Sequence, residues 1–438
     1  MAPRTERKSN HLILCTVRRC LASDALRETF RRSPRDFTRE RKMSFKKVVL
    51  FMLSLSRRSL QIELTGFVRS FADGVRNVTG SAFNQSRRKV APGVFKQIMG
   101  VMNQEFYTDN DERVQRWEGL RLLATNGSIL NLPHTKELSE RYGGTSNQHG
   151  NRTVQARSSV LYDVLNNMVL HGVLSPWAVG ERELATQHLP LCHADDLMIY
   201  DRGYPSYALM LGVRERGAHF LIRCTHKFNQ QVIDFVAGTR HSHTVEMGAG
   251  KNTLHGRGPQ RKDREAVRMV KVLLDNGEVE VLLTSLLDAQ RYPTATFKEL
   301  YHKRWGVERF YNTIKNIARV EHFTGHTDLV IQQDFHCALF MCNLHALLLS
   351  EAQEQLPATQ PERKLTYKIN SNVSFGYMKN ETLRILSDQD DERTLRDLSE
   401  LFLSSTVPIR PGRRFPRNGE KYRTRNKPVY LTNSKPAL

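Results

Sequence analysis

The sequence has few cysteines and no long apolar run, and both absences narrow the class of protein. Its six cysteines form no Cys-x2-Cys pair and no dense spacing, which argues against a disulfide scaffold and favours a reducing compartment. The longest apolar candidate, 48–55, is about half a membrane span. The apolar segment 11–17 is too short for a signal peptide. We therefore expect a soluble, cytoplasmic protein with no membrane partner.

Metal-ligand residue types gather in one apolar stretch, at His336, Cys337, Cys342 and His345. A zinc site needs these side chains to converge on one point. Their offsets instead scatter them around a helix. We interpret them as buried core residues.

Acidic residues are scarce relative to basic ones, with 45 Asp+Glu against 66 Lys+Arg and a net charge of +21. Residues 1–47 carry +9 and residues 401–438 carry +8, so the ends hold 17 of the 21 charges. Strongly basic ends on either side of a middle region with a small net charge indicate a protein whose ends bind the phosphate backbone of a nucleic acid. A solvated basic tail is the alternative interpretation.

The composition divides the chain into four regions. Residues 1–45 are Arg-rich and weakly patterned, and we interpret them as a basic arm. Residues 46–118 combine helical apolar spacing with basic residues, which predicts a helical DNA-binding module, although a charged outer surface would show the same pattern. The core spans 119–355, and a basic C-terminal region spans 356–438.

The core pattern predicts an α/β fold. The apolar segments 120–123 and about 129–132, followed by 158–165 and 168–174, predict a three-strand antiparallel meander. A helical piece at 181–188 and a buried strand at 197–200 are expected next. A helix capped by Ser206 and a strand at 218–223 complete a β-β-β-α-β-α-β order. This order around a mixed sheet is the ribonuclease H-like plan.

An inserted β subdomain is predicted at about 225–290, where the helical period vanishes. Two apolar runs, 267–274 and 279–286, flank the turn sequence Asp-Asn-Gly-Glu, which is a strong hairpin signal. Beyond it, Thr296 and Glu299 have the spacing of a capping box for one helix that runs to about Arg319. A second, apolar helix is expected at about 329–353.

Four polar residues of the first predicted helix share one face. Offsets of 3, 7 and 14 from Tyr301 place Arg304, Glu308 and Lys315 near one line along the helix. Such a stripe alone would be an ordinary solvated face with ion pairs. Trp305 beside it is interpreted as a core residue, with base stacking as the alternative.

Asp201 gives this stripe a candidate partner, because it follows an apolar strand and begins a tight Gly-Tyr-Pro turn. Magnesium-dependent phosphoryl transfer needs hard oxygen ligands of this kind. An aspartate that caps its own turn is an equally good account of Asp201 considered alone.

These residues together resemble bacterial insertion-sequence transposases of the DDE class, in the group with a Tyr-x2-Arg-x3-Glu-x6-Lys signature (the insertion sequence four family). Tyr301, Arg304, Glu308 and Lys315 match that signature in full, and the Asp-x-Gly-Tyr context of Asp201 is similar to the family's second acid. The resemblance runs from about residue 36 to 416. It implies that Asp201 and Glu308 are metal-binding catalytic acids. It also implies that Tyr301, Arg304 and Lys315 contact transposon-end DNA.

One position departs from the family pattern. The family's first acid begins an Asp-Gly-Ser/Thr motif, and Asn126 takes its place in the stretch Asn-Gly-Ser. Asn126 is thus the third expected catalytic and metal-binding residue, yet its amide brings no negative charge. We expect severely weakened metal binding and strand transfer. Asp163 on the adjacent strand, or deamidation of Asn126, are the alternatives by which a carboxylate would be restored.

The resemblance implies a DNA transposase that uses Mg²⁺, with Mn²⁺ as a substitute, to cleave transposon ends and transfer the strands. Its partners would be double-stranded DNA, the terminal inverted repeats and target DNA, bound by a homodimer near the bacterial nucleoid. Two rival functions remain at this point. One is a catalytically inactive DNA-binding relative that inhibits transposition, and the other is a metal nuclease unconnected with transposition.

Overall fold

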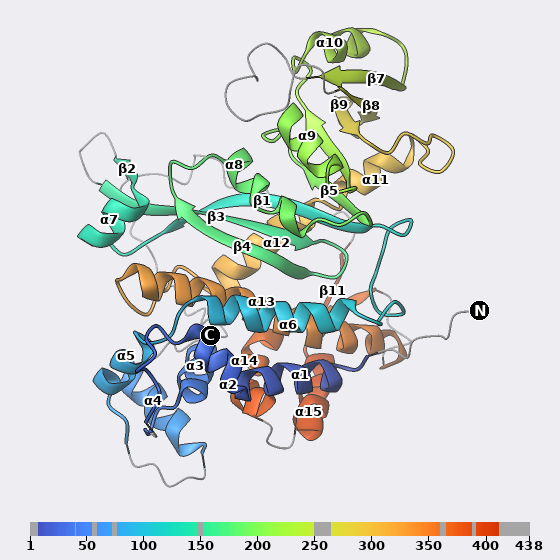
Figure 1. Ribbon diagram of the computed structural model, residues 1–438. Coiled ribbons are helices and arrows are strands. Elements are labelled where there is room, and N and C mark those ends of the chain that lie inside the picture. Colours follow the sequence, from blue (N-terminus) through green and yellow to red (C-terminus); the bar gives the residue numbers. More distant parts are fainter. Residues whose placement is uncertain are drawn as a thin grey trace, which may run out of the picture.

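The computed structural model describes residues 8–39, 41–54, 59–71, 77–146, 152–248, 264–359, 365–387 and 391–410. The basic tail beyond Arg410 and the pair Arg57 and Arg58 lie outside these residues. Figure 1 shows a large sheet lying on a layer of helices, with α6 (Gly93–Tyr107) and α13 (Asp328–Thr359) directly beneath β4 (Met168–Pro176). The fold is therefore mixed α/β around one central sheet.

The middle of the sheet combines antiparallel and parallel strands. Strands β1 (Arg121–Asn131), β3 (Arg152–Asp163) and β4 (Met168–Pro176) form the predicted antiparallel meander. Strands β5 (Asp196–Tyr200) and β6 (His219–Cys224) then add in parallel beside β1. The order β4-β3-β1-β5-β6 confirms the mixed sheet that the strand pattern predicts. Helices α8 (Glu181–Thr186) and α9 (Tyr207–Arg214) connect these strands, and Ser206 caps α9 as expected.

The predicted insertion continues the same sheet and does not form a sheet of its own. Strand β9 (Val279–Thr284) pairs with β6, and β8 (Arg264–Leu273) and β7 (Ser242–Gly248) follow in order. The hairpin between β8 and β9 is confirmed, and Gly277 adopts φ +84° in its turn. One helix was not expected here. Helix α10 (Gln230–Ala237) is capped by Asn229 and buries only Val232 and Phe235, so its period is short.

The interpretation of residues 1–45 as an arm is wrong for the part that the structure describes. Ser9 caps helix α1 (Asn10–Ala22), in which Ile13, Leu14 and Val17 are fully buried. Their spacing places them on one side of the helix, so α1 buries an apolar face although the surrounding sequence is rich in Arg. Helix α1 packs on α6 (Gly93–Tyr107), and helix α2 (Asp24–Phe30) also contacts α6.

Helices from both ends of the chain share one layer. Helices α3 (Phe45–Leu53), α4 (Leu60–Arg69) and α5 (Gly80–Arg87) come from the N-terminal half, and α14 (Ser371–Ser387) and α15 (Asp391–Ser404) come from the C-terminal end. Arg18 on α1 donates to the carbonyl of Ile385 on α14 at 2.7 Å. A short ladder joins β10 (Tyr367–Ile369) to β11 (Thr406–Pro408). The described C-terminal residues are therefore part of the packed helical layer.

Helix α13 (Asp328–Thr359) runs along the centre of this layer. It is long and apolar enough to cross a membrane by length and composition alone, but 78% of its most apolar window is buried inside the protein. Its metal-ligand residue types, His336, Cys337, Cys342 and His345, are all buried core residues, as the sequence predicts. His345 shares a hydrogen bond of 2.8 Å with Ser374 on α14.

Candidate active site

The candidate site lies where β1 and β5 stop pairing. Their parallel register joins Ala124 to Ile199, and β5 ends at Tyr200. Continuing that register by two residues brings Asn126 level with Asp201. Strand β1 runs on to Asn131 without this neighbour. The two residues that the family pattern assigns to the first and second acids therefore occupy matching register positions just beyond the point where the two strands stop pairing.

The helix that carries the third acid is not continuous, which corrects the prediction of one helix to about Arg319. Helix α11 (Thr296–His302) ends before a turn at 303–304, helix α12 (Trp305–Asn312) follows, and residues Thr313–Ile317 form a π-helical turn. The predicted capping box is also wrong. Ala295 precedes the first helical residue and makes no side-chain cap, and the Thr296 hydroxyl donates to the carbonyl of Pro293 at 2.8 Å.

Asp201 contacts both its own turn and the end of α11. Its Oδ1 accepts the backbone N–H of Arg202 at 2.6 Å and the hydroxyl of Tyr301 at 3.4 Å. The turn-capping role and the role as partner of the stripe therefore coexist. Burial raises the pKa of Tyr301, and the charge of Asp201 adds to this, so the phenol stays protonated and able to donate.

Arg304 connects Tyr301 to Glu308. Its Nη2 lies 2.8 Å from Oε1 of Glu308, and its guanidinium lies over the Tyr301 ring at 5.7 Å and the Trp305 ring at 5.4 Å. Burial alone would lower the pKa of Arg304, but Tyr301 and the nearby carboxylates outweigh burial and raise it. Only 4% of the Arg304 side chain is exposed, so its positive charge is compensated mainly by Glu308 and not by solvent.

Trp305 is not a core residue, which corrects the interpretation from sequence. It is 42% exposed. With Tyr301 and Arg223 it lines a cavity of about 940 Å³ between α11 and the β8–β9 hairpin. A helix-period pattern alone does not identify which side of α12 faces solvent, because the turn at 303–304 resets the direction of the helix.

The side chain of Lys315, in the π-helical turn, reaches β1. Its Nζ donates to the carbonyl of Ile129 at 2.6 Å. Tyr311, one turn earlier, donates to the carbonyl of Asn126 at 3.0 Å. Sequence reasoning missed Tyr311, because nothing in its local pattern marks it. Together Tyr311 and Lys315 attach the helix of Glu308 to the strand of Asn126.

The donor set of this edge suits a hard divalent cation, but it is incomplete. Asp201 and Glu308 each use one carboxylate oxygen in the contacts above, and the described part of the chain donates no hydrogen bond to the other oxygen. The amide oxygen of Asn126 accepts the N–H of Gly127 at 3.0 Å. Among the described residues, no three Asp, Glu, His or Cys side chains gather closely enough to hold an ion. Oxygen ligands are present, and one negative charge is lacking.

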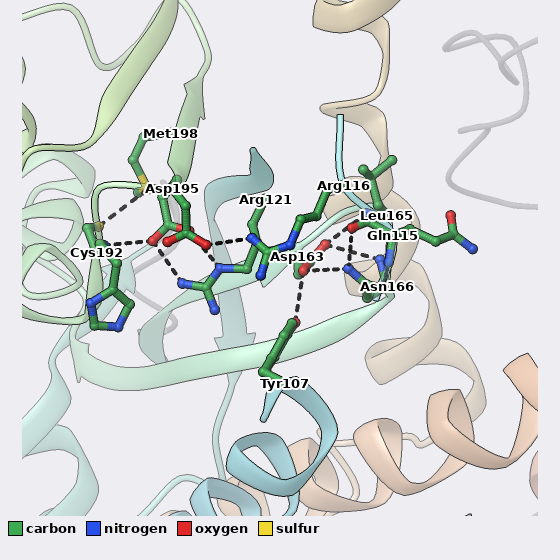
Figure 2. A network of polar contacts seen from close by, with 12 residues as sticks. Tyr107, Gln115, Arg116, Arg121, Asp163, Leu165, Asn166, Cys192, Asp195 and Met198 are labelled. Carbon is green, nitrogen blue, oxygen red and sulfur yellow. Dashed lines mark hydrogen bonds and ion pairs between the residues drawn. The ribbon is translucent and has the colours of Figure 1, made fainter. Parts of the chain in front are cut away.

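Asp163, the alternative source of this charge, has a structural role. It is fully buried and lies opposite Leu123, three residues before Asn126. Figure 2 shows its carboxylate enclosed by Tyr107 and Asn166. It accepts the Tyr107 hydroxyl at 2.8 Å and the Asn166 side chain at 2.8 Å, besides two backbone N–H groups. Burial raises its pKa against these hydrogen bonds. A carboxylate held in this way has no free oxygen for a metal ion.

Residues 117–344, more than half of the chain, match the family model described as "Transposase DDE domain". The chain belongs to this family. DNA transposition is therefore its function, and the resemblance to bacterial insertion-sequence transposases carried by Tyr301, Arg304, Glu308 and Lys315 is confirmed. Nothing in these matches favours the alternative of a catalytically inactive DNA-binding protein.

Individual relatives in the transposase family are distant. The transposase InsG of insertion sequence element IS4 from Escherichia coli strain K12 is 22% identical over 351 residues, which cover 78% of this chain and 76% of InsG. A protein of the same strain named InsZ is 25% identical over 169 residues, covering 37% of this chain and 55% of InsZ. A piggyBac transposase synaptic complex with hairpin DNA shares 8% identity and a TM-score of 0.41, covering 89% of this chain and 81% of that one.

Proposed function

We propose that this transposase cleaves transposon ends by phosphoryl transfer at the β1–β5 edge. The observation that carries the proposal is the contact of Asp201 with Tyr301, which packs with Arg304 and Glu308, close to where the β1–β5 register would bring Asn126 level with Asp201. A ribonuclease H-like core is the plan that the strand order β4-β3-β1-β5-β6 supports. We assign Asn126, Asp201 and Glu308 as the catalytic and metal-binding residues.

Mg²⁺, or Mn²⁺ in its place, would be held by the carboxylates of Asp201 and Glu308 with the amide oxygen of Asn126. When bound, such ions activate the attacking oxygen and stabilise the leaving oxygen. In the described conformation the chain's own residues hold these two carboxylates in place. Tyr301 orients Asp201 through its hydroxyl, and Arg304 orients Glu308 through its guanidinium.

The DNA contacts of the proposal come from Tyr301, Arg304 and Lys315. Tyr301 and Arg304 present donors beside Asp201 and Glu308, and Lys315 presents one at the carbonyl of Ile129 on β1. Phosphate oxygens accept such bonds with charge assistance. Lys315 now donates to a neutral carbonyl, so a phosphate oxygen that reached it would be the stronger acceptor. Transposon-end DNA would thus be held where the acids lie.

The remaining parts of the chain supply wider DNA contacts in this proposal. The helices between 46 and 118 form the DNA-binding module, the core spans 119–355, and residues 356–438 add a basic region whose tail carries most of its charge. The packing of α1 with α14 makes the N-terminal and C-terminal helices one unit in space. Double-stranded DNA, the terminal inverted repeats and target DNA are the proposed partners. A homodimer is proposed because transposition joins two ends, and the nucleoid in the cytoplasm is the proposed location.

The lack of charge at Asn126 limits cleavage in this proposal. Two carboxylates balance less of the charge of two divalent ions than three do. The test is Mg²⁺-dependent nicking of labelled duplexes that carry the terminal repeats, compared with random duplexes at the same salt concentration. We expect Asn126→Asp to raise the nicking rate, and Asp201→Asn and Glu308→Gln to abolish it.

The matched control is Asn276→Asp, which adds the same charge in the exposed β8–β9 turn and keeps an acceptor for the N–H of Glu278. Equal rates for Asn126→Asp and the unmodified chain would contradict the idea that position 126 limits catalysis. Nicking that survives Asp201→Asn and Glu308→Gln would contradict the site itself. Equal nicking of random duplexes would favour a nuclease unconnected with transposition.

A further inference from the structure

Glu181, the first residue of α8, packs directly on the strand that carries Asn126. An added Cβ at Gly127 would lie 3.0 Å from both Cγ and Oε1 of Glu181, closer than ordinary van der Waals contact. A side chain at position 127 would therefore make the Glu181 side chain move away from β1 by a few tenths of an ångström. Gly127, which follows Asn126 in the sequence, therefore lies against a carboxylate from another element, helix α8.

Two buried tyrosines connect Glu181 to the candidate site. Burial is the main cause that raises the pKa of Tyr204, and the charges of Glu181 and Asp201 both add to it. Burial likewise raises the pKa of Tyr311, and Glu181 adds to that as well. Tyr311 is the residue that donates to the carbonyl of Asn126 at 3.0 Å. Glu181 is therefore near enough for its charge to act on Tyr204 and Tyr311, and Tyr311 itself contacts the backbone of Asn126.

The Glu181 carboxylate can leave its ion pair with Arg157 at a low cost in free energy. Its Oε1 lies 2.9 Å from Nη1 of Arg157, and the two side chains are 39% and 21% exposed. A partly exposed ion pair contributes little to stability. Arg157 also donates through Nε to the carbonyl of Trp177 at 3.3 Å, so it keeps a partner when the carboxylate leaves. The arrangement parallels that of Glu308, which is paired with Arg304.

The open edge of β1 lets side chains from both faces of the strand reach one point. Asn126 and Gly127 point to opposite faces because side chains alternate along a strand. Beyond Ala124, however, β1 has no β5 neighbour to separate the two faces. A carboxylate over Gly127 can therefore reach the edge at which Asp201 lies.

We propose that Glu181 supplies the third carboxylate of the divalent-ion site, in the place that Asn126 leaves uncharged. The inference rests on the proposed function, because it assigns a further ligand to the same ion site. In the described conformation Glu181 and Glu308 each face an arginine, and both carboxylates would turn from these partners toward Asp201 to hold an ion. Gly127 is then a positioning residue that permits the approach of Glu181.

The test measures Mn²⁺ binding to the full chain by calorimetry and by the loss of the free-ion electron paramagnetic resonance signal. Glu181→Gln keeps the shape of the side chain and removes the charge, and we expect it to weaken Mn²⁺ binding about tenfold or more. Glu183→Gln is the matched control, because Glu183 lies in the same first turn of α8 and is exposed. Adding Asn126→Asp to Glu181→Gln should restore binding to the unmodified level.

Gly127→Ala provides a second route to the same conclusion, since its Cβ displaces the Glu181 carboxylate and should also weaken Mn²⁺ binding. Equal dissociation constants for Glu181→Gln and Glu183→Gln, with binding lost in Asp201→Asn, would overturn the role of Glu181 and leave the proposed function standing. Binding that survives Asp201→Asn and Glu308→Gln, or no binding by the unmodified chain, would overturn both. Circular dichroism melting curves confirm that each variant is folded.

Discussion

The ion pair of Arg121 and Asp196 should be among the most costly to break in this fold. Nε and Nη2 of Arg121 donate to the two oxygens of Asp196 at 2.7 and 2.9 Å, and Asp196 is fully buried. The pair joins the first residue of β1 to the first residue of β5, so it fixes the two strands whose far ends form the candidate site. Replacing Asp196 with Asn would leave a buried guanidinium without its charge partner.

The expected cost follows from that burial. Removing one partner of a buried ion pair costs about 3–5 kcal/mol, because the remaining charge stays desolvated. Asp196 also accepts the backbone N–H of His193 at 2.8 Å, which an Asn oxygen can still accept. We therefore expect Asp196→Asn to lower the free energy of unfolding by about 3 kcal/mol, the lower end of that range.

The neighbouring residue provides the control. Asp195 pairs with Arg116, and both appear beside Arg121 in Figure 2, but their side chains are 48% and 28% exposed. Asp195→Asn should cost less than about 1 kcal/mol, because solvent replaces an exposed partner. Urea titrations followed by circular dichroism would give both values. A difference of less than about 1 kcal/mol between the two variants would refute the argument from burial.

Three further outcomes follow from the described contacts. Burial lowers the pKa of His188 to about 3 and that of His345 to about 4, so their contribution to stability is complete above pH 6.5 and is lost as the pH falls toward 4. Going from pH 7.5 to 5.5 should cost about 3 kcal/mol for the two together, and equal urea midpoints at both pH values would contradict this. Lys315→Met should reduce the salt dependence of end binding by about one phosphate contact, and an unchanged slope in fluorescence anisotropy would remove Lys315 from the DNA interface. Asp163→Asn should lower the free energy of unfolding by about 1–3 kcal/mol with no change in Mn²⁺ affinity, whereas a loss of affinity would make Asp163 a ligand.

Local patterns in the sequence predict most of the sheet and the position of Asp201. Alternating apolar residues set the strands, and the Asp-Asn-Gly-Glu turn set the β8–β9 hairpin. The break at 303–304 was missed, because apolar residues keep a helical period on both sides of a short turn. Helix α1 was missed because its arginines obscured the apolar stripe of Ile13, Leu14 and Val17.

The residues that surround the candidate site were harder to predict from the sequence than the two acids that locate it. Asp201 and Glu308 stand in recognisable local contexts, so the family pattern locates them. Glu181 lies against Gly127, 54 residues earlier in the chain, and Tyr311 contacts Asn126, 185 residues earlier. The spacing of apolar residues reports only local structure, so it cannot predict contacts between residues so far apart in the chain. The same holds for Asp163, whose partners Tyr107 and Asn166 become visible only in the folded protein.

The packing of α1 against α14 and α15 sets an order for folding during synthesis. The ribosome makes Ile13, Leu14 and Val17 first, yet part of the surface that covers α1 belongs to residues near Ile385 and beyond. Until that segment emerges, the nascent chain carries apolar side chains without their full set of partners. A chain cut short before α14 would keep this surface exposed, so incomplete copies should aggregate or be degraded while full-length copies fold.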